Sequence, residues 1–401
     1  MDIKTADETW QSGKAKTITF IVTKDCQLAC KYCYLVGKNN NERMPWDVAK
    51  AAIDYILDNE SEFPEESVIW DFIGGEPFLE IELIDKICDY LKVEMFKRNH
   101  HWFNSYRFSF STNGINYGNE KVQYFIHKNY EHLSIGITID GTRRKHDMNR
   151  VYKGYDEKGS YDDVVKNIPL WLQQFEGGGT KVTISSPDIP YVKESVLHLF
   201  SLGIKEVHIN CVFENVWKEG DDILFERQLI ELADEIIDKD LYIENTCSFF
   251  SEQIGKPYSD NSNWCGAGKM LAIDAAGNFY PCTRFAKYSL REKEAWIIGN
   301  VYDGIDKNKL RPFLMLNRKV QSPNECMTCE VASGCAWCQG ENYDAADTAT
   351  IFQRSIAICK MHKARVRANN YYWNKLFRKL ELEGKREEFE ANKPIIDNNI
   401  C

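Results

Sequence analysis

Three cysteines, Cys26, Cys30 and Cys33, lie so close in the chain that their sulfurs could bind one metal centre. Thiolates are soft ligands that suit zinc and iron–sulfur clusters. A structural zinc site takes four protein ligands, usually from two separated cysteine pairs. The next cysteine is Cys88, so the loop could hold three irons of a four-iron cluster and leave one iron open to a small molecule. The spacing therefore favours an iron–sulfur cluster over zinc.

Seven more cysteines gather in the last third of the chain. They are Cys265, Cys282, Cys326, Cys329, Cys335, Cys338 and Cys359. C-x2-C pairs are typical of zinc ribbons, but seven cysteines do not divide into two closed sites of four ligands. The alternation of strands and helices also stops past residue 250. We therefore expect a second module that folds around metal centres rather than around apolar side chains.

Composition limits the classes of function that the chain could have. Its 401 residues include 14 cysteines, and its formal net charge is −10. There is no apolar stretch of the roughly 18 residues that a membrane helix needs, and residues 1–16 are polar, unlike a signal peptide. We therefore expect a cytoplasmic protein without membrane contact, in which cysteines indicate metal or redox chemistry. The negative charge argues against nucleic-acid binding, and we expect the one basic run, Lys360–Lys379, to be a solvated helix face.

Periodic apolar residues indicate the elements that must position these groups. Six β-rich runs recur at 17–23, 67–73, 106–112, 133–139, 181–186 and 206–212. Helical patterns lie between them, at 45–59, 79–95, 121–128, 162–175 and 191–202. Such alternation predicts parallel strands joined by right-handed crossovers. Six units are too few for an eight-unit barrel, so we predict an α/β fold with a partial (β/α)6 TIM-like barrel.

The patterns also divide the chain and mark candidate ligand positions. The expected parts are an N-terminal segment 1–16, the barrel 17–250, the cysteine-rich module 251–360 and a charged C-terminal helical segment 361–401. In barrels of this kind, functional residues follow the carboxyl ends of strands. Glycine and polar residues fall there at Gly74–Pro77, Thr112–Gly114 and Asp140–Gly141. Glycine allows close approach of a ligand that a Cβ would block.

The loop from Cys26 to Cys33 resembles the C-x3-C-x2-C signature of the radical S-adenosylmethionine (AdoMet) superfamily, and the resemblance extends over the barrel half. In that family AdoMet binds the open iron, and one-electron reduction yields a 5′-deoxyadenosyl radical. Such a radical abstracts almost any hydrogen, so it must form in a closed, dry site. Four residues are similar to the family's GGEP element, whose backbone and glutamate bind the amino group of AdoMet: Gly74, Gly75, Glu76 and Pro77.

Other residues of the barrel half take implied roles from the same resemblance. Tyr32 stands where the family often has an aromatic residue that contacts the adenine. Asp140, with the following His146 and Arg150, resembles a segment that contacts the ribose and the carboxylate of AdoMet. Ser185, at the end of the fifth predicted strand, is a further candidate for this site.

The later cysteines resemble the SPASM extension of radical AdoMet enzymes, which carries two auxiliary four-iron clusters. The resemblance therefore implies three four-iron clusters in all. It implies that the distal auxiliary cluster is closed by Cys326, Cys329, Cys335 and Cys359. It implies that the inner one, with a vacant iron, is held by Cys265, Cys282 and Cys338. The family usually has three residues between the equivalents of Cys335 and Cys338, whereas this chain has two, so the assignment of these two cysteines stays open.

Three hypotheses about the reaction follow. The first is a maturase that installs thioether crosslinks in a Cys-rich ribosomal precursor peptide, because Cys26–Lys38 and the chain length are most similar to maturases of peptides with Cys-x-x-x repeats. The second is oxidation of Ser or Cys to formylglycine, as in sulfatase maturation, or carbon–carbon crosslinking or epimerisation. Formylglycine-forming enzymes usually have an acid after the GxxYPC cysteine, where this chain has Thr283. The third, an electron-transfer scaffold, has no use for the GGEP-like element.

The first hypothesis implies two partners. One is a Cys-containing precursor peptide, and the other is a low-potential electron donor such as flavodoxin or ferredoxin. Only 25 residues precede Cys26, too few for a leader-binding domain. We therefore expect the basic C-terminal helix or a separate protein to recognise any leader.

Overall fold

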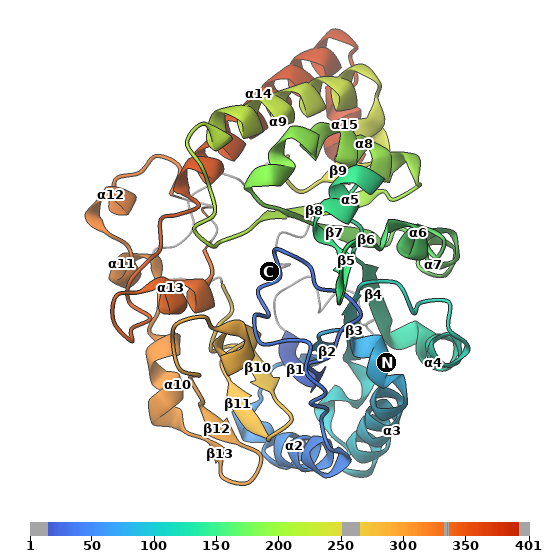
Figure 1. The fold of residues 1–401 in the computed structure, drawn as a ribbon, viewed down its shortest axis with the longest axis vertical. Helices are drawn as coiled ribbons and strands as arrows, with labels where there is room; N and C mark the ends of the chain where they lie inside the picture. The colour runs from blue at the N-terminus through green and yellow to red at the C-terminus, as the bar shows by residue number, and fades with distance from the viewer. Residues whose placement is uncertain (1–14, 251–264, 333–334, 336, 393–401) are drawn as a thin grey trace.

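A computed structural model of the protein describes residues 15–250, 265–332, 335 and 337–392. Six parallel strands form the wall of an open barrel (Figure 1). They are β1 (Ala15–Thr23), β2 (Ser67–Gly74), β3 (Tyr106–Thr112), β4 (Leu133–Ile137), β7 (Gly179–Ile184) and β8 (Glu206–Cys211). Every predicted strand is confirmed to within a few residues, and paired neighbours run parallel. The prediction of an α/β fold with a partial barrel is correct.

The wall contains a junction between two sheets. Strands β1 to β4 belong to one sheet, and β7 and β8 belong to another. The Thr180 hydroxyl bridges them, because it donates to the Ile137 carbonyl (2.7 Å) and accepts from the Ile139 N–H (3.1 Å). One side chain thus replaces a backbone ladder between β4 and β7.

Helices and one hairpin connect the barrel strands. They are α2 (Trp46–Asp58), α3 (Ile81–Lys97), α4 (Glu120–Asn129), α5 (Arg143–Asn149), the hairpin β5 (Val151–Tyr152) and β6 (Tyr155–Gly159), α6 (Tyr161–Val165), α7 (Ile168–Gln174) and α8 (Val192–Ser201). In α2 the buried residues include Val48, Ala52 and Ile56, the stripe that an amphipathic helix turns toward a core. The helix predicted at 162–175 is two helices, α6 and α7. Pro169, in the first turn of α7, has no N–H to continue a single helix.

The sheet of β1 continues into the second part of the chain. Strand β10 (Leu271–Ile273) pairs parallel with β1. Three short antiparallel strands follow it: β11 (Asn278–Tyr280), β12 (Gly299–Asn300) and β13 (Gly304–Ile305). The cysteine-rich part is thereby joined to the barrel wall by backbone pairing, which no local sequence pattern had indicated.

An aromatic core stabilises this second part. The ring of Phe313 lies 4.9 Å from that of Phe285 and 5.2 Å from that of Trp296, which in turn lies 5.4 Å from Tyr343. The expectation of a module that folds around metal centres rather than apolar side chains is therefore wrong in this respect. Its short helices are α10 (Lys307–Leu314), α11 (Arg318–Gln321), α12 (Asn324–Met327) and α13 (Gln339–Ala345).

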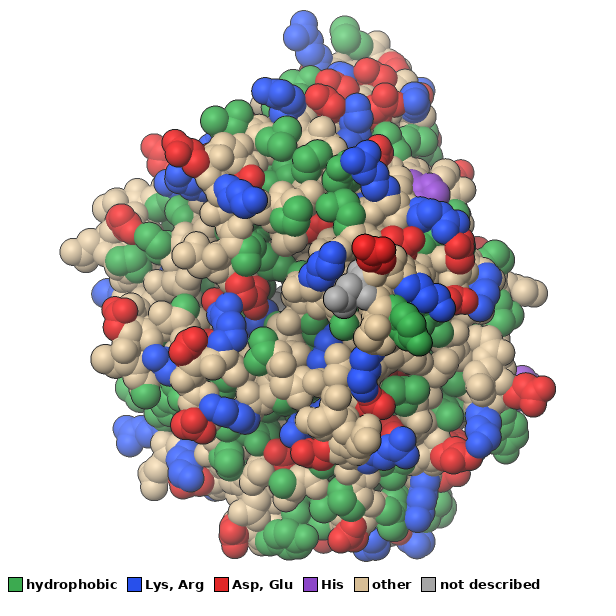
Figure 2. All heavy atoms as spheres, in the orientation of Figure 1, with side chains coloured by type: hydrophobic (Ala, Val, Ile, Leu, Met, Phe, Trp, Pro, Cys, Tyr) green, Lys and Arg blue, Asp and Glu red, His purple; other side chains and the backbone are tan. Residues whose placement is uncertain are grey.

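Two long helices pack side by side at one end of the molecule, α9 (Asp221–Asp238) and α14 (Cys359–Leu382), and α15 (Arg386–Asn392) follows them (Figure 1). Basic residues of α14 face acidic residues of α9 and its end. The ion pairs are Arg367–Glu226 (2.6 Å), Lys375–Asp234 (2.8 Å) and Lys379–Asp240 (2.7 Å). Figure 2 shows acidic and basic side chains mixed over these helices. The basic run is therefore not simply solvated, because part of it is paired.

Two remaining expectations concern the ends of the parts and the membrane. The predicted segment 1–16, the stretch 251–264 and Cys401 lie wholly or mostly outside the described residues. The division into four parts thus stays a prediction. None of the helices described is both long and apolar enough to cross a bilayer.

Candidate functional site

The cysteine loop that follows β1 is fixed by backbone hydrogen bonds to the segment around β5. Ala29 N–H donates to the Val151 carbonyl (2.8 Å), and Lys31 N–H donates to the Asn149 carbonyl (3.0 Å). Lys153 N–H returns a bond to the Gln27 carbonyl (2.8 Å). The loop that carries Cys26, Cys30 and Cys33 is therefore held against the segment after β4, at the carboxyl ends of the strands.

Two glycines let the end of β2 approach the same loop. A Cβ on Gly74 would lie 2.2 Å from the Thr23 carbonyl oxygen, and a Cβ on Gly75 would lie 2.1 Å from the Asp25 carbonyl oxygen. Real Cβ atoms do not come so close to backbone atoms, so only glycine fits. The approach allows Gly75 N–H to donate to Thr23 (3.0 Å) and Glu76 N–H to donate to Asp25 (2.8 Å). The GGEP-like element is thus bonded to the start of the cysteine loop.

The three cysteines share a protected environment. Burial raises the pKa of Cys26 to about 12 and also raises the pKa of Cys30. Lys38 stands beside all three: burial lowers its pKa, but the nearby cysteines raise it more. The Asn113 amide donates to the Cys26 sulfur at 3.9 Å. Because a metal displaces the thiol protons when it binds, a buried loop with an adjacent cation and amide suits bound thiolates.

Glu76 joins the ends of β2 and β3. Its carboxylate, which is 1% exposed, accepts from the Thr112 hydroxyl (2.6 Å), the Asn113 N–H (2.8 Å) and the Phe78 N–H (3.1 Å). Burial raises the pKa of Glu76, against the effect of these hydrogen bonds. A carboxylate has about four acceptor positions, so these three bonds leave room for one more donor.

Three residues far apart in the chain meet at the ends of β1 and β4. The Tyr32 hydroxyl donates to the Asp140 carboxylate and accepts from Arg150 Nη1 (3.0 Å). Asp140 is fully buried and also accepts from the Thr183 N–H (3.2 Å). Burial opposes its ionisation, but Lys145 and Arg150 outweigh burial and lower its pKa. The structure thus brings together Tyr32, Asp140 and Arg150, which the sequence assigned to one site.

His146 holds the turn that carries Asp140. Its Nδ1 accepts from the Asp140 N–H (3.2 Å), while its Nε2 faces the Ser160 hydroxyl (3.0 Å). That hydroxyl already donates to the Arg150 carbonyl (2.9 Å), so Nε2 must carry the proton. Burial lowers the pKa of His146 to about 3, which agrees with a neutral ring. His146 therefore supports the site rather than exchanging protons in it.

Ser185 lies at the end of β7, 8% exposed, and is committed to Asp188. Its N–H and its hydroxyl both donate to one Asp188 oxygen, at 2.7 and 2.6 Å. The hydroxyl can therefore only accept a further hydrogen bond. Asp188 accepts from the Asn149 amide (2.6 Å), which links Ser185 to α5.

The cysteines of the second part form two groups. The pKa of Cys335 is raised to about 11, mainly by burial and against the lowering effect of Arg354, with smaller upward contributions from three neighbouring cysteines: Cys359, Cys326 and Cys329. The Arg354 guanidinium donates to the Cys335 sulfur at 3.0 Å. In the other group, the Gln339 N–H donates to the Cys265 sulfur at 3.4 Å, which brings Cys265 beside Cys338. Cys335 is thus near the other three cysteines of the implied distal set, and Cys265 is near Cys338 of the implied inner set, while the full ligand assignment stays a prediction.

Arg284 connects the inner group to the barrel. Its guanidinium lies over the Tyr34 ring (4.3 Å) and pairs with Glu214 (2.7 Å), which follows β8. Burial lowers its pKa, but Cys338 and Glu214 raise it more. For Tyr34, burial is the main cause that raises the pKa, to about 12, and Cys33 and Cys282 contribute smaller increases. The first cysteine loop and the inner group are therefore neighbours around Tyr34 and Arg284.

Other candidate features lie away from this region. Cys88 is a core residue of α3, as expected, and Cys247 is buried on β9 (Thr246–Cys247).

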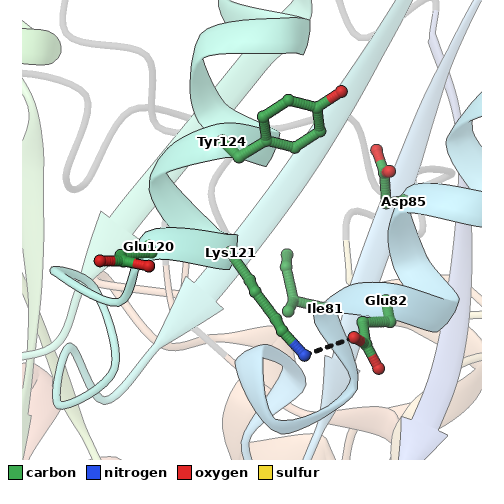
Figure 3. A pocket seen from close by; sticks show the side chains of 6 residues that line it. All are labelled: Ile81, Glu82, Asp85, Glu120, Lys121 and Tyr124. Carbon is green, nitrogen blue, oxygen red and sulfur yellow. Dashed lines mark hydrogen bonds and ion pairs between the residues drawn. The ribbon is translucent and has the colours of Figure 1, made fainter.

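In the part of the chain that the structure describes, one group of potential ligands converges within 4.8 Å: Glu60, His100 and His101. It precedes β2 and β3, at the opposite strand ends. The open pocket in Figure 3 lies between α3 and α4, where Lys121 pairs with Glu82.

Four residues of the site had no individual role predicted for them. Asn113 had a signal, because it belongs to the polar turn Thr112–Gly114 after a strand. Lys38, Lys145 and Arg284 had none, since a lysine or arginine in a loop or a charged run is ordinarily solvated. Their roles depend on long-range packing that the local sequence does not encode.

Comparison with known proteins agrees with this architecture. Residues 12–154 match a family model described as a 4Fe-4S single cluster domain. An uncharacterized protein of Methanocaldococcus jannaschii is 28% identical over 301 residues, which cover 74% of this chain and 91% of that protein. An uncharacterized protein of Synechocystis sp. is 26% identical over 193 residues, 47% of this chain and 45% of that protein.

Solved structures show the same fold at low sequence identity. Native anSMEcpe with bound AdoMet superposes with a TM-score of 0.69 and 18% identity, over 92% of this chain and 100% of that one. Streptococcus suis SuiB bound to precursor peptide SuiA gives a TM-score of 0.57 and 14% identity, over 86% of this chain and 75% of that one. This chain therefore has the fold of anSMEcpe and SuiB, from the barrel strands into the cysteine-rich part.

Proposed function

We propose that the chain is a radical AdoMet enzyme that modifies peptides, and that its product is a thioether bond between a cysteine sulfur and a carbon of a Cys-rich precursor peptide. The observation that carries the proposal is the convergence of two sets of residues at the carboxyl ends of the strands. One set is the three cysteines of the loop 26–33. The other is the bonded trio Tyr32, Asp140 and Arg150 beside it.

The residues fit a four-iron cluster with AdoMet on its open iron. Three soft ligands stand on one loop, where Cys26 is buried and Cys30 and Cys33 are partly buried. The ammonium group of AdoMet needs an acceptor, and Glu76 has one position left after its three bonds. The carboxylate of AdoMet needs donors, and Arg150 Nε is buried without a hydrogen-bond partner among the described residues. A reduced four-iron cluster with AdoMet bound would supply a 5′-deoxyadenosyl radical.

The residues of the chain would orient AdoMet and keep water out. Glu76 is held by three donors, so its free position has a fixed direction. Arg150 is held through the Tyr32 hydroxyl, which is itself fixed by Asp140. Such preorganisation removes the entropy cost of arranging these groups around the bound molecule. The buried surroundings of Glu76 and Asp140 exclude competing solvent.

A peptide substrate is supported by the structural neighbours. SuiB was crystallised with precursor peptide SuiA, and anSMEcpe with the Cp18Cys peptide. The thioether product, rather than formylglycine, is supported by the residues after Cys282. Thr283 cannot act as a carboxylate base, and the nearby Glu214 is engaged by Arg284. Clusters held by the later cysteines would accept the electron that remains after hydrogen abstraction, and a low-potential flavodoxin or ferredoxin would supply the initial one.

Mass spectrometry of a treated peptide separates the possible products. The anaerobically reconstituted protein is incubated with AdoMet, dithionite and a synthetic peptide of repeated Cys-x-x-x units. A thioether bond removes two hydrogens and one alkylatable thiol per crosslink but keeps the sulfur. Formylglycine formation from cysteine removes the sulfur. Loss of sulfur, or turnover of a sulfatase peptide instead, would contradict the thioether proposal.

A further inference from the structure

The side chain of Lys145 is wholly buried between two buried carboxylates. Its ammonium lies 3.9 Å from an Asp140 oxygen and 3.8 Å from an Asp188 oxygen, and all three side chains are 0% exposed. It also donates a hydrogen bond to the Thr183 carbonyl at the end of β7 (2.9 Å). A lysine without access to water is unusual, because its charge loses hydration that only close partners can replace.

Each carboxylate reaches a different part of the proposed AdoMet site. Asp140 accepts from the Tyr32 hydroxyl in the cysteine loop. Asp188 accepts from both the N–H and the hydroxyl of Ser185, after β7. Lys145 is therefore the cation that these two segments share, and it reaches them from α5.

We infer that Lys145 is a positioning residue. Its ammonium holds the Asp140 and Asp188 carboxylates in place, and these carboxylates in turn fix the positions of Tyr32 and Ser185 for AdoMet binding. The inference rests on the proposed function of the site. Arg150 donates to the Tyr32 hydroxyl, whereas Asp188 forms its ion pair with Lys145, and His146 is neutral. Without Lys145, the buried Asp188 carboxylate would have no cation beside it among the described residues and would keep the Asn149 amide and Ser185 as donors.

A matched control is available at the opposite strand ends. Lys16 on β1 is also buried, at 9% exposure, and pairs with Glu65 (3.3 Å). Replacing either ion pair by neutral side chains of similar shape removes one lysine–carboxylate pair, although Glu65 is 28% exposed whereas Asp188 is fully buried. Only the pair with Lys145 touches the proposed site, so K16M/E65Q measures the purely structural effect.

The experiment compares K145M/D188N with K16M/E65Q in the full, anaerobically reconstituted chain. The double change removes one positive and one negative charge, so that one buried carboxylate, Asp140, loses Lys145 instead of the two that would lose it in K145M alone. Iron content, the thermal unfolding midpoint and the AdoMet dissociation constant from equilibrium dialysis are measured. The EPR spectrum of the reduced protein is recorded at saturating AdoMet.

We expect K145M/D188N to keep its iron, to bind AdoMet at least about tenfold more weakly, and to show an EPR spectrum unlike that of the wild type at saturation. K16M/E65Q should bind as the wild type does. K145Q, which leaves Asp188 and its hydrogen bonds to Ser185 in place and can still donate to Thr183, is measured alongside with the same expectation as K145M/D188N. Unchanged AdoMet affinity and spectrum in the Lys145 variants, or equal weakening in both double variants, would overturn the inference. A wild-type protein that binds no AdoMet would instead overturn the proposed function, and the inference with it.

Discussion

At the scale of single residues, the site depends on two glycines without a Cβ as much as on the side chains that form hydrogen bonds. Gly74 and Gly75 let β2 touch the cysteine loop, because a Cβ at either would collide with a backbone oxygen. Glu76 then turns back to hold Thr112 and Asn113. These short-range contacts fix where a cluster and its ligand could lie relative to each other.

Replacing Gly75 by alanine should displace the cysteine loop. The new Cβ would lie 2.1 Å from the Asp25 oxygen and 2.9 Å from the Cys26 Cβ, so one of them must move. We expect G75A to lose about four irons while circular dichroism stays near that of the wild type. The control is G136A in β4, where the nearest atom to a new Cβ is 3.7 Å away. Full iron content in G75A would contradict this role of the glycine.

Replacing Glu76 by glutamine should weaken AdoMet binding more than cluster assembly. Hydrogen bonds to a charged group contribute about 1.5–3 kcal/mol, and the Gln amide would also face the Asn113 N–H, donor against donor. We expect the AdoMet dissociation constant of E76Q to rise at least about tenfold, since 1.4 kcal/mol is a factor of ten. Equilibrium dialysis, with iron analysis of the same sample, measures both quantities. An unchanged affinity would remove Glu76 from the site.

At the scale of elements, the local patterns predicted the barrel but not its extensions. The six strands are correct because their β-rich runs and the helices between them are local signals. The pairing of β10 with β1 was missed, since it joins residues more than 250 positions apart. The aromatic core around Phe313 was missed because its rings come from separate short segments with no regular strand or helix pattern. The first cysteine loop was found because its short spacings bring the sulfurs together almost without regard to the rest of the fold, whereas the sets of later cysteines came from a family resemblance, since Cys265 and Cys338 lie far apart in the chain.

The contact between α9 and α14 should depend on charge. Lys375 pairs with both Asp234 (2.8 Å) and Asp238 (2.9 Å). Partly exposed pairs contribute about 0.2–1 kcal/mol each, so K375E, which adds repulsion, should destabilise the protein by about 1–2 kcal/mol. Chemical denaturation in low salt measures the change, and about 1 M salt should reduce it. Lys360, an exposed lysine of the same helix, provides the control K360E. An effect of K375E that is equal to that of K360E would contradict the role of the pair.

At the scale of the whole molecule, the barrel and the cysteine-rich part are tied together beside the site. Backbone pairing between β1 and β10 does so along the sheet. Arg284 does so near the cysteines, through Tyr34 and Glu214. Gly340 leaves room for it, because a Cβ there would lie 2.3 Å from the Arg284 Cβ. These contacts therefore fix the position of the cysteine-rich part relative to the first cysteine loop.

Removing Arg284 should loosen that connection. R284M leaves Glu214 as a mostly buried carboxylate without its cation, which costs about 3 kcal/mol in comparable pairs. We expect a lower thermal unfolding midpoint for R284M, largely restored in E214Q/R284M, where no charge is left unpaired. Differential scanning calorimetry under anaerobic conditions measures both. If the double variant is as unstable as R284M, packing over Tyr34 rather than charge accounts for the connection.

The most direct test of the account is AdoMet cleavage by a protein without the first cysteine loop. The anaerobically reconstituted wild type should hold about twelve irons and, with dithionite, convert AdoMet to 5′-deoxyadenosine. The triple variant C26A/C30A/C33A should hold about eight irons and form no 5′-deoxyadenosine, since the later cysteines remain but the open iron is gone. Continued cleavage in the triple variant, or zinc as the main metal of the wild type, would contradict the central claim.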